Sequence, residues 1–155
     1  MTPRPILLAT DGSHSAAEAT LEAVALARDL GTRLVVVAVD HPVSPGNGFY
    51  GYSEVLGKLR IAEHERTGRA LAQASSSARE AGVECEPVHA GLGARVVDEI
   101  CRVADVHDAR MIVIGAHDWS PIKRVVNGSV STAVTHEARC PVLVVPARSA
   151  AGGEL

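Results

Sequence analysis

The stretch Ile6-Leu7-Leu8-Ala9-Thr10-Asp11-Gly12-Ser13 places a short apolar run directly before a polar turn that contains glycine. The run does not alternate between apolar and polar residues, which is typical of a strand covered on both faces. Four further apolar runs follow along the chain, at Leu34–Val39, Val83–Val88, Met111–Ile114 and Val142–Val145. Only the run from Val83 alternates, because Glu84 and Glu86 interrupt it, and we expect this strand at an edge of the sheet.

The segments between these runs have the apolar periodicity of helices. After the first strand, Ser15 followed by Glu18 matches a capping box, and Gly31 is expected to end the helix. Further helices are predicted over residues 54–80, from Val96 onward, and from near residue 129 to before Pro141. Strands that alternate with helices predict an α/β fold with an open parallel sheet and right-handed crossovers. We expect one domain over residues 1–148 and a flexible tail over residues 149–155.

The composition argues against several classes of protein. The 155 residues can bury a core, and the 3% of aromatic residues means that this core is built from Val, Leu, Ile and Ala. The net charge is −3 and the basic residues are scattered, so neither a nucleic acid nor a membrane surface is expected as a partner. The sequence has no signal-type apolar segment, and we expect a cytoplasmic protein. The widely spaced Cys85, Cys101 and Cys140 are expected to remain reduced.

The segment from Gly115 to Ser131 has the composition of a phosphate-binding loop. In open parallel sheets, ligands bind at the carboxyl ends of the strands, and Gly115 allows a turn and a close ligand approach at such an end. Gly128-Ser129 opens a predicted helix, whose free N–H groups favour an anion, and Ser129 and Ser131 add hydroxyl donors. The alternative is that Ser129 only caps its helix and that both glycines only form turns.

Other motifs carry little weight in this sequence. There is no Gly-x-x-x-x-Gly-Lys-Ser/Thr segment, and Gly91-Leu92-Gly93-Ala94-Arg95-Val96 lacks the third glycine of a dinucleotide fingerprint. Only His117 stands beside the predicted phosphate loop. The other six histidines have no metal-ligand spacing, so no metal site is expected. The order of the residues gives no catalytic grouping, and we expect no catalytic residue and no enzyme.

From about Pro5 to Pro146 the chain resembles the universal stress protein family. The resemblance rests on the opening segment Ile6 to Ser13, the closing segment Cys140-Pro141-Val142-Leu143-Val144-Val145-Pro146 and the loop between them. Members that bind ATP carry a glycine, two residues, a second glycine, nine residues, and then Gly-Ser or Gly-Thr. Gly115 and Gly128-Ser129 match this pattern, whereas Asp118 stands in the place of the middle glycine.

The resemblance implies a Rossmann-like five-stranded sheet in the order 3-2-1-4-5 and a homodimer formed through the fifth strand. The apolar, uncharged strand Val142–Val145 suits such pairing, because an uncovered edge strand offers free backbone groups. The resemblance also implies an ATP site, with Asp11 facing the adenine or ribose and the Val39 backbone at the adenine edge. The residues carried over to this site are Ala9, Thr10, Asp11, Val39, Ile114, Gly115, Asp118, Gly128, Ser129, Val130 and Ser131. For Asp11 the alternative is an Asx turn with Ser13.

The functional hypotheses differ in the effect of Asp118 on nucleotide binding. A carboxylate about 5 Å from a phosphate costs about 3 kcal/mol at an effective dielectric constant near 20. Lys123 and Arg124 could offset this charge, or Mg²⁺ could bridge Asp118 to the phosphates; the alternative for both basic residues is a solvated loop face. Three hypotheses follow: an ATP-binding regulator of the stress response, a protein that acts through partners and has lost nucleotide binding, and a slow ATPase modified at Ser129 or Ser131.

Overall fold

The computed structural model describes residues 2–43, 52–91, 95–116 and 130–148, and these form a five-stranded parallel sheet. The strands lie in the order β3-β2-β1-β4-β5, so the predicted α/β fold and strand order are confirmed. Their bounds are β1 (Ile6–Ala9), β2 (Leu34–Val39), β3 (Cys85–Ala90), β4 (Met111–Gly115) and β5 (Val142–Val145). β3 lies at an edge, as its alternating sequence indicates.

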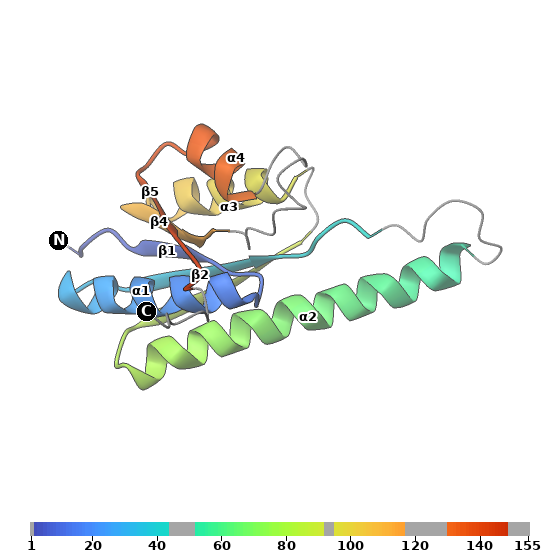
Figure 1. Ribbon diagram of the computed structural model, residues 1–155, viewed down its shortest axis with the longest axis horizontal. Helices are drawn as coiled ribbons and strands as arrows, with labels where there is room; N and C mark the ends of the chain where they lie inside the picture. The colour runs from blue at the N-terminus through green and yellow to red at the C-terminus, as the bar shows by residue number, and fades with distance from the viewer. Residues whose placement is uncertain (1, 44–51, 92–94, 117–129, 149–155) are drawn as a thin grey trace, which may run out of the picture.

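Four helices cover the two faces of the sheet. Their bounds are α1 (His14–Asp29), α2 (Tyr52–Glu80), α3 (Val96–Val106) and α4 (Val130–Glu137). Helices α1 and α2 pack on one face, and α3 and α4 on the other (Figure 1). Successive strand residues point to opposite faces, so Leu8 joins the core beneath α1 and α2, while Leu7 joins the core beneath α3 and α4. Because both faces of β1 and β2 are buried, their sequences are continuously apolar.

The prediction for the third strand was wrong at its start, because Val83 lies in the turn that caps α2. Gly82 has a φ of +76°, and its N–H donates to the carbonyl of Arg79. The N–H of Val83 donates to the carbonyl of Ala78, which completes a Schellman motif. Val83 is therefore apolar and buried as part of a helix terminus, and β3 begins two residues later, at Cys85.

The predicted capping box of α1 was also wrong, since the N-cap lies two residues earlier than Ser15 and the helix begins at His14. Ser13 has extended backbone angles, and its hydroxyl accepts a hydrogen bond from the N–H of Ala16. Ser15 lies buried in the first turn, with its hydroxyl 3.2 Å from that of Ser13. Ser13 is thus the N-cap. At the other end the prediction is confirmed, because Gly31, which follows the C-cap residue Leu30, has a φ of +62°.

Helix α2 is much longer than the strands that it crosses. Its 29 residues extend about 43 Å, whereas the six residues of β2 extend about 20 Å. The amino-terminal part of α2 therefore projects beyond the sheet (Figure 1). Leu59 and Ile61, in this projecting part, are exposed. No helix in the described ranges is long and apolar enough to cross a membrane.

Candidate functional site

The carboxyl ends of β1, β2 and β4, the three central strands, lie next to one another at one end of the sheet. Ala9 at the end of β1 is in register with Val37 of β2 on one side and Ile114 of β4 on the other. After β1 the chain forms β2 on one side of β1 and later forms β4 on the other side. The carboxyl ends of β1 and β4 are therefore a topological switch point. Such a point opens a crevice for ligands, because the loops after β1 and β4 lead to helices on opposite faces.

Several of the predicted nucleotide-binding residues lie at these carboxyl ends of the strands. Six of them end a strand or directly follow one: Ala9, Thr10 and Asp11 at the end of β1, Val39 at the end of β2, and Ile114 and Gly115 at the end of β4. Val130 and Ser131 form the start of α4, on the face that α3 also covers. Asp118, Gly128 and Ser129 lie outside the described residues, as does the predicted tail over residues 149–155.

The turn after β1 has a defined hydrogen-bonding pattern. Oδ1 of Asp11 accepts from the N–H of Ser13 at 2.9 Å, which is the Asx turn considered as the alternative for this residue. The hydroxyl of Thr10 accepts from the N–H of Gly12 at 3.3 Å. Gly12 has a φ of +78°, a conformation that side chains with a Cβ rarely adopt. The turn therefore fixes the direction of the Asp11 side chain at the strand end.

Gly115 is required by packing within the protein. A Cβ at this position would lie 2.6 Å from the carbonyl carbon and oxygen of Ser15 and 2.9 Å from the nitrogen of Ala16. The end of β4 thus contacts the backbone of the first turn of α1. The sequence suggested that Gly115 admits a ligand, but the close approach in the described structure is that of α1.

Arg66 of α2 connects this helix to the ends of β1 and β2. Its Nη1 donates to the carbonyl oxygen of Asp11 at 2.8 Å. Its Nε and Nη2 donate to the two carboxylate oxygens of Glu63 at 2.9 and 2.7 Å. Oε1 of Glu63 in turn accepts from the N–H of His41, which follows β2, at 2.8 Å. The hydrogen bonds from Arg66, helped by that of His41, outweigh burial and lower the pKa of Glu63 to about 2.

A second polar cluster lies beside this one, at the ends of β2 and β3. Oδ1 of Asp40 is 2.8 Å from Nε2 of His89, and Oδ2 is 3.0 Å from Nδ1 of His64. The two imidazole rings stack, with centroids 4.2 Å apart and an angle of 18° between the planes. Burial of Asp40 opposes its ionisation, but the hydrogen bonds from His89, His64 and Thr67 together outweigh it and lower the pKa of Asp40 to about 2.

The chain matches known proteins over nearly its whole length. The model of the Universal stress protein family matches residues 2–146. The chain belongs to the universal stress protein family. A universal stress protein of Thermus aquaticus is 36% identical over 142 residues, which cover 92% of this chain and 98% of that protein. The resemblance inferred from the sequence motifs is therefore confirmed.

Solved universal stress proteins share the fold. A structure from Archaeoglobus fulgidus has a TM-score of 0.74 and 28% identity, and the match covers 92% of this chain and 98% of that one. A second structure from Archaeoglobus fulgidus, a complex with dAMP, has a TM-score of 0.63 and 27% identity. That match covers 94% of this chain and 99% of the complexed chain. Nucleotide binding therefore occurs among the structural relatives of this universal stress protein.

The sequence analysis of this universal stress protein missed Arg66 and the group of Asp40, His64 and His89. The residues of each cluster are far apart in the chain and come together only because α2 docks along β2 and β3. One signal was available in the helical spacing. Glu63 and Thr67 lie on the same face of α2 as the buried Ala70, Leu71 and Ala74. A buried face that becomes polar at one end indicates polar partners at that end.

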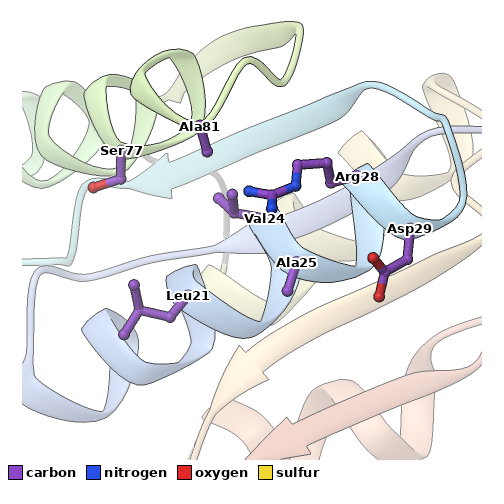
Figure 2. Close-up of a pocket in the computed structure, with 7 residues that line it drawn as sticks. All are labelled: Leu21, Val24, Ala25, Arg28, Asp29, Ser77 and Ala81. Carbon is purple, nitrogen blue, oxygen red and sulfur yellow. The ribbon is translucent and has the colours of Figure 1, made fainter.

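Two other features of this universal stress protein lie away from the carboxyl ends of β1, β2 and β4. A groove of about 290 Å³ lies between α1 and the end of α2 (Figure 2). Its lining residues are Leu21, Val24, Ala25, Arg28, Asp29, Ser77 and Ala81. The three cysteines are free, as predicted. Burial raises the pKa of Cys101 and of Cys140, which favours the protonated, less nucleophilic form of each thiol.

Proposed function

We propose that this universal stress protein binds an adenine nucleotide, with ATP as the ligand, and acts as a regulator of the stress response without being an enzyme. The observation that carries the proposal is the switch point, where Asp11, Val39 and Gly115 stand at the carboxyl ends of three adjacent strands. The complex of an Archaeoglobus fulgidus relative with dAMP supports the same ligand class. The cytoplasmic location expected from the sequence belongs to this proposal.

The geometry of the turn after β1 supports this proposal. Its Asx turn orients the half-buried Asp11 carboxylate, and Arg66 holds the Asp11 carbonyl from α2. A carboxylate held in this way can accept hydrogen bonds from ribose hydroxyls without a further loss of side-chain entropy. In the proposal, the Val39 backbone contacts the adenine edge, and Ala9, Thr10 and Ile114 form the wall of the site. Residues 128–131 hold the phosphates.

Asp118 favours a second candidate function. A negative charge at the place of the middle glycine opposes the phosphates, and the protein would then act through protein partners alone. In the leading proposal, Mg²⁺ that enters with ATP neutralises this charge. The two functions make different predictions for the affinity for nucleotide, so a single titration separates them.

The decisive measurement is isothermal titration calorimetry with ATP on the wild type and on Asp118→Gly. We expect wild type to bind ATP when Mg²⁺ is present. Without Mg²⁺, which in the proposal neutralises Asp118, we expect Asp118→Gly to bind ATP up to about 100-fold more tightly than wild type, because about 3 kcal/mol of repulsion is removed. Asp108→Gly is the matched control, since it removes the same charge at the amino end of β4 from a residue with a φ of +48°. It is expected to leave the ATP affinity unchanged.

Three results would contradict the nucleotide proposal or favour one of the alternative functions. If folded wild type and folded Asp118→Gly both fail to bind ATP at millimolar concentration, the proposal is wrong. If only Asp118→Gly binds, the second candidate function holds for the wild type. A rate of phosphate release that is lowered by Ser129→Ala would instead indicate a slow ATPase.

We also propose that the protein forms a homodimer through β5. This strand is at the edge of the sheet and pairs only with β4 among the described strands. Leu143 and Val144 are 37% and 38% exposed, and the strand carries no charge that would discourage pairing. The side chains and free backbone groups of β5 therefore suit a second copy of this strand.

Leu143→Lys tests the homodimer. We expect light scattering to give a dimer for wild type and a monomer for Leu143→Lys, because a lysine on an edge strand opposes strand pairing. Leu21→Lys is the control, since Leu21 is 64% exposed on α1 and lines the groove between α1 and α2. A wild-type protein that remains monomeric at all concentrations would contradict the proposal.

A further inference from the structure

Asp40, His64 and His89 bring three potential metal ligands together from three different elements. Asp40 directly follows β2, His89 lies in β3, and His64 lies in α2. One carboxylate oxygen and one ring nitrogen from each histidine all lie within 4.8 Å of one another. Among the described residues, no other group of three or more His, Cys, Asp or Glu side chains has this arrangement.

The spacing of these atoms suits an ion held between them. Zn²⁺ binds imidazole nitrogen at about 2.0–2.1 Å and carboxylate oxygen at about 2.0–2.2 Å, so tetrahedral ligands lie about 3.4 Å apart. The present N···O distances, 2.8 and 3.0 Å, need to widen by about half an ångström, while the ligand atoms that lie farther apart, all within 4.8 Å of one another, need to move closer. The His64 side chain is 66% exposed, so it can make this adjustment, and it leaves a path for the ion to enter.

The donor set selects a class of metal ion. Two imidazoles and one carboxylate suit zinc and the neighbouring divalent transition metals, whereas Mg²⁺ and Ca²⁺ prefer oxygen ligands. Three protein ligands leave a fourth position for water. We propose that Asp40, His64 and His89 form a binding site for one divalent transition-metal ion, with Zn²⁺ as the representative ion.

The surroundings of the three ligands favour a cation. Asp40 supplies a carboxylate oxygen, an anionic ligand that attracts a cation. Its side chain is only 14% exposed and is already held at both carboxylate oxygens, which reduces the entropy cost of binding. The adjacent Arg66 is paired with Glu63, so the positive charge of Arg66 is compensated. Because the charge of the Asp40 carboxylate is not compensated in this way, the region has a net negative charge.

The site lies beside the proposed nucleotide site and is independent of it. Asp40 is the residue after Val39, but its carboxylate contacts α2 and β3, away from β1 and β4. Metal binding can therefore be measured without nucleotide. A failure of the metal proposal would leave the nucleotide proposal untouched, and the reverse also holds.

The test is a titration of the full, tag-free chain with Zn²⁺, and with Co²⁺ as a spectroscopic probe. We expect one ion per chain and a Co²⁺ visible spectrum typical of four or five ligands, without the ultraviolet charge-transfer band that a cysteine ligand gives. His64→Ala is expected to weaken binding by at least about tenfold, since even the loss of an outer partner of a ligand costs about 10- to 100-fold. His89→Ala and Asp40→Asn should do the same.

His14→Ala is the matched control, because His14 is an exposed histidine at the start of α1. It should leave the Zn²⁺ affinity and the Co²⁺ spectrum unchanged. Wild type without a saturable site, or with an affinity equal to that of His64→Ala, would overturn the proposal. The same holds if the Co²⁺ spectrum shows the thiolate band. His64 is mostly exposed, so folded His64→Ala is expected, and circular dichroism verifies it.

Discussion

Gly115→Ala is expected to lower the free energy of unfolding by about 3 kcal/mol or more. The added Cβ would lie 2.6 Å from backbone atoms of Ser15, and backbone atoms cannot rotate away as a side chain can. Either β4 or the first turn of α1 has to shift, and both are parts of the buried core. Urea denaturation followed by circular dichroism measures the change.

Gly68→Ala provides the control for this prediction. Gly68 lies inside α2, and a Cβ at this position has no atom within 4 Å. Alanine favours a helix over glycine, so this variant should gain about 0.5–1 kcal/mol. The same substitution therefore has opposite signs at the two sites. If Gly115→Ala is as stable as wild type, the close contact between β4 and α1 does not exist in solution.

Glu63→Gln is expected to cost about 3 kcal/mol at neutral pH, and the cost should disappear in acid. The pKa of Glu63 falls from an ordinary 4.5 to about 2 in the folded protein, which corresponds to about 3 kcal/mol of stabilisation by the charged form. Its side chain is 13% exposed, so solvent screens the interaction only weakly. The measurement is urea denaturation of both proteins at a series of pH values between 7 and about 2.

The sign of the pH dependence follows from the lowered pKa. Glu63 contributes fully above the pKa of its unfolded form, and the contribution is lost as pH falls toward its folded pKa. The difference between wild type and Glu63→Gln should therefore be constant above about pH 5 and close to zero near pH 2. Asp40 adds an acid-sensitive contribution of its own, which both proteins share.

Glu65→Gln is the control, because Glu65 is exposed on the same helix. It should match wild type within about 0.5 kcal/mol at every pH. A loss in Glu63→Gln that did not change with pH would show that shape, and not charge, makes Glu63 important. The hydrogen bonds from Arg66 and His41 would then need another explanation.

Most of the fold could be predicted from the pattern of apolar runs. β1, β2 and β5 have the predicted bounds, because each is a continuous apolar run that ends at a polar or turn-forming residue. The start of β3 could not be predicted in this way. A buried apolar residue such as Val83 serves equally well in a strand and in a Schellman motif, and only the positive φ of Gly82 separates the two. Likewise, two serines compete to cap α1, and the Asx turn of Asp11 selects Ser13.

Only those residues of the candidate site could be predicted whose place in the sequence follows from a general rule. Ligand sites lie at strand ends, and this rule located Asp11, Val39 and Gly115. The partners from α2 follow from the rotation and docking of a helix, which no short motif specifies. Arg66 is 55 residues from Asp11, and His64 and His89 are 25 residues apart, so their contacts became visible only in the folded structure.

The projecting amino-terminal part of α2 has a consequence for the local unfolding of the protein. Residues 53–62 are mostly exposed, and their stability rests on local helix energetics, to which an exposed ion pair such as Glu54 with Lys58 adds only about 0.5 kcal/mol. A helical segment of about ten residues is marginal in water by itself. This part of α2 can therefore unwind while the sheet stays intact, and the contacts of Glu63 and Arg66 mark the point at which such unwinding stops. Local opening and global unfolding are thus separate equilibria in one continuous helix.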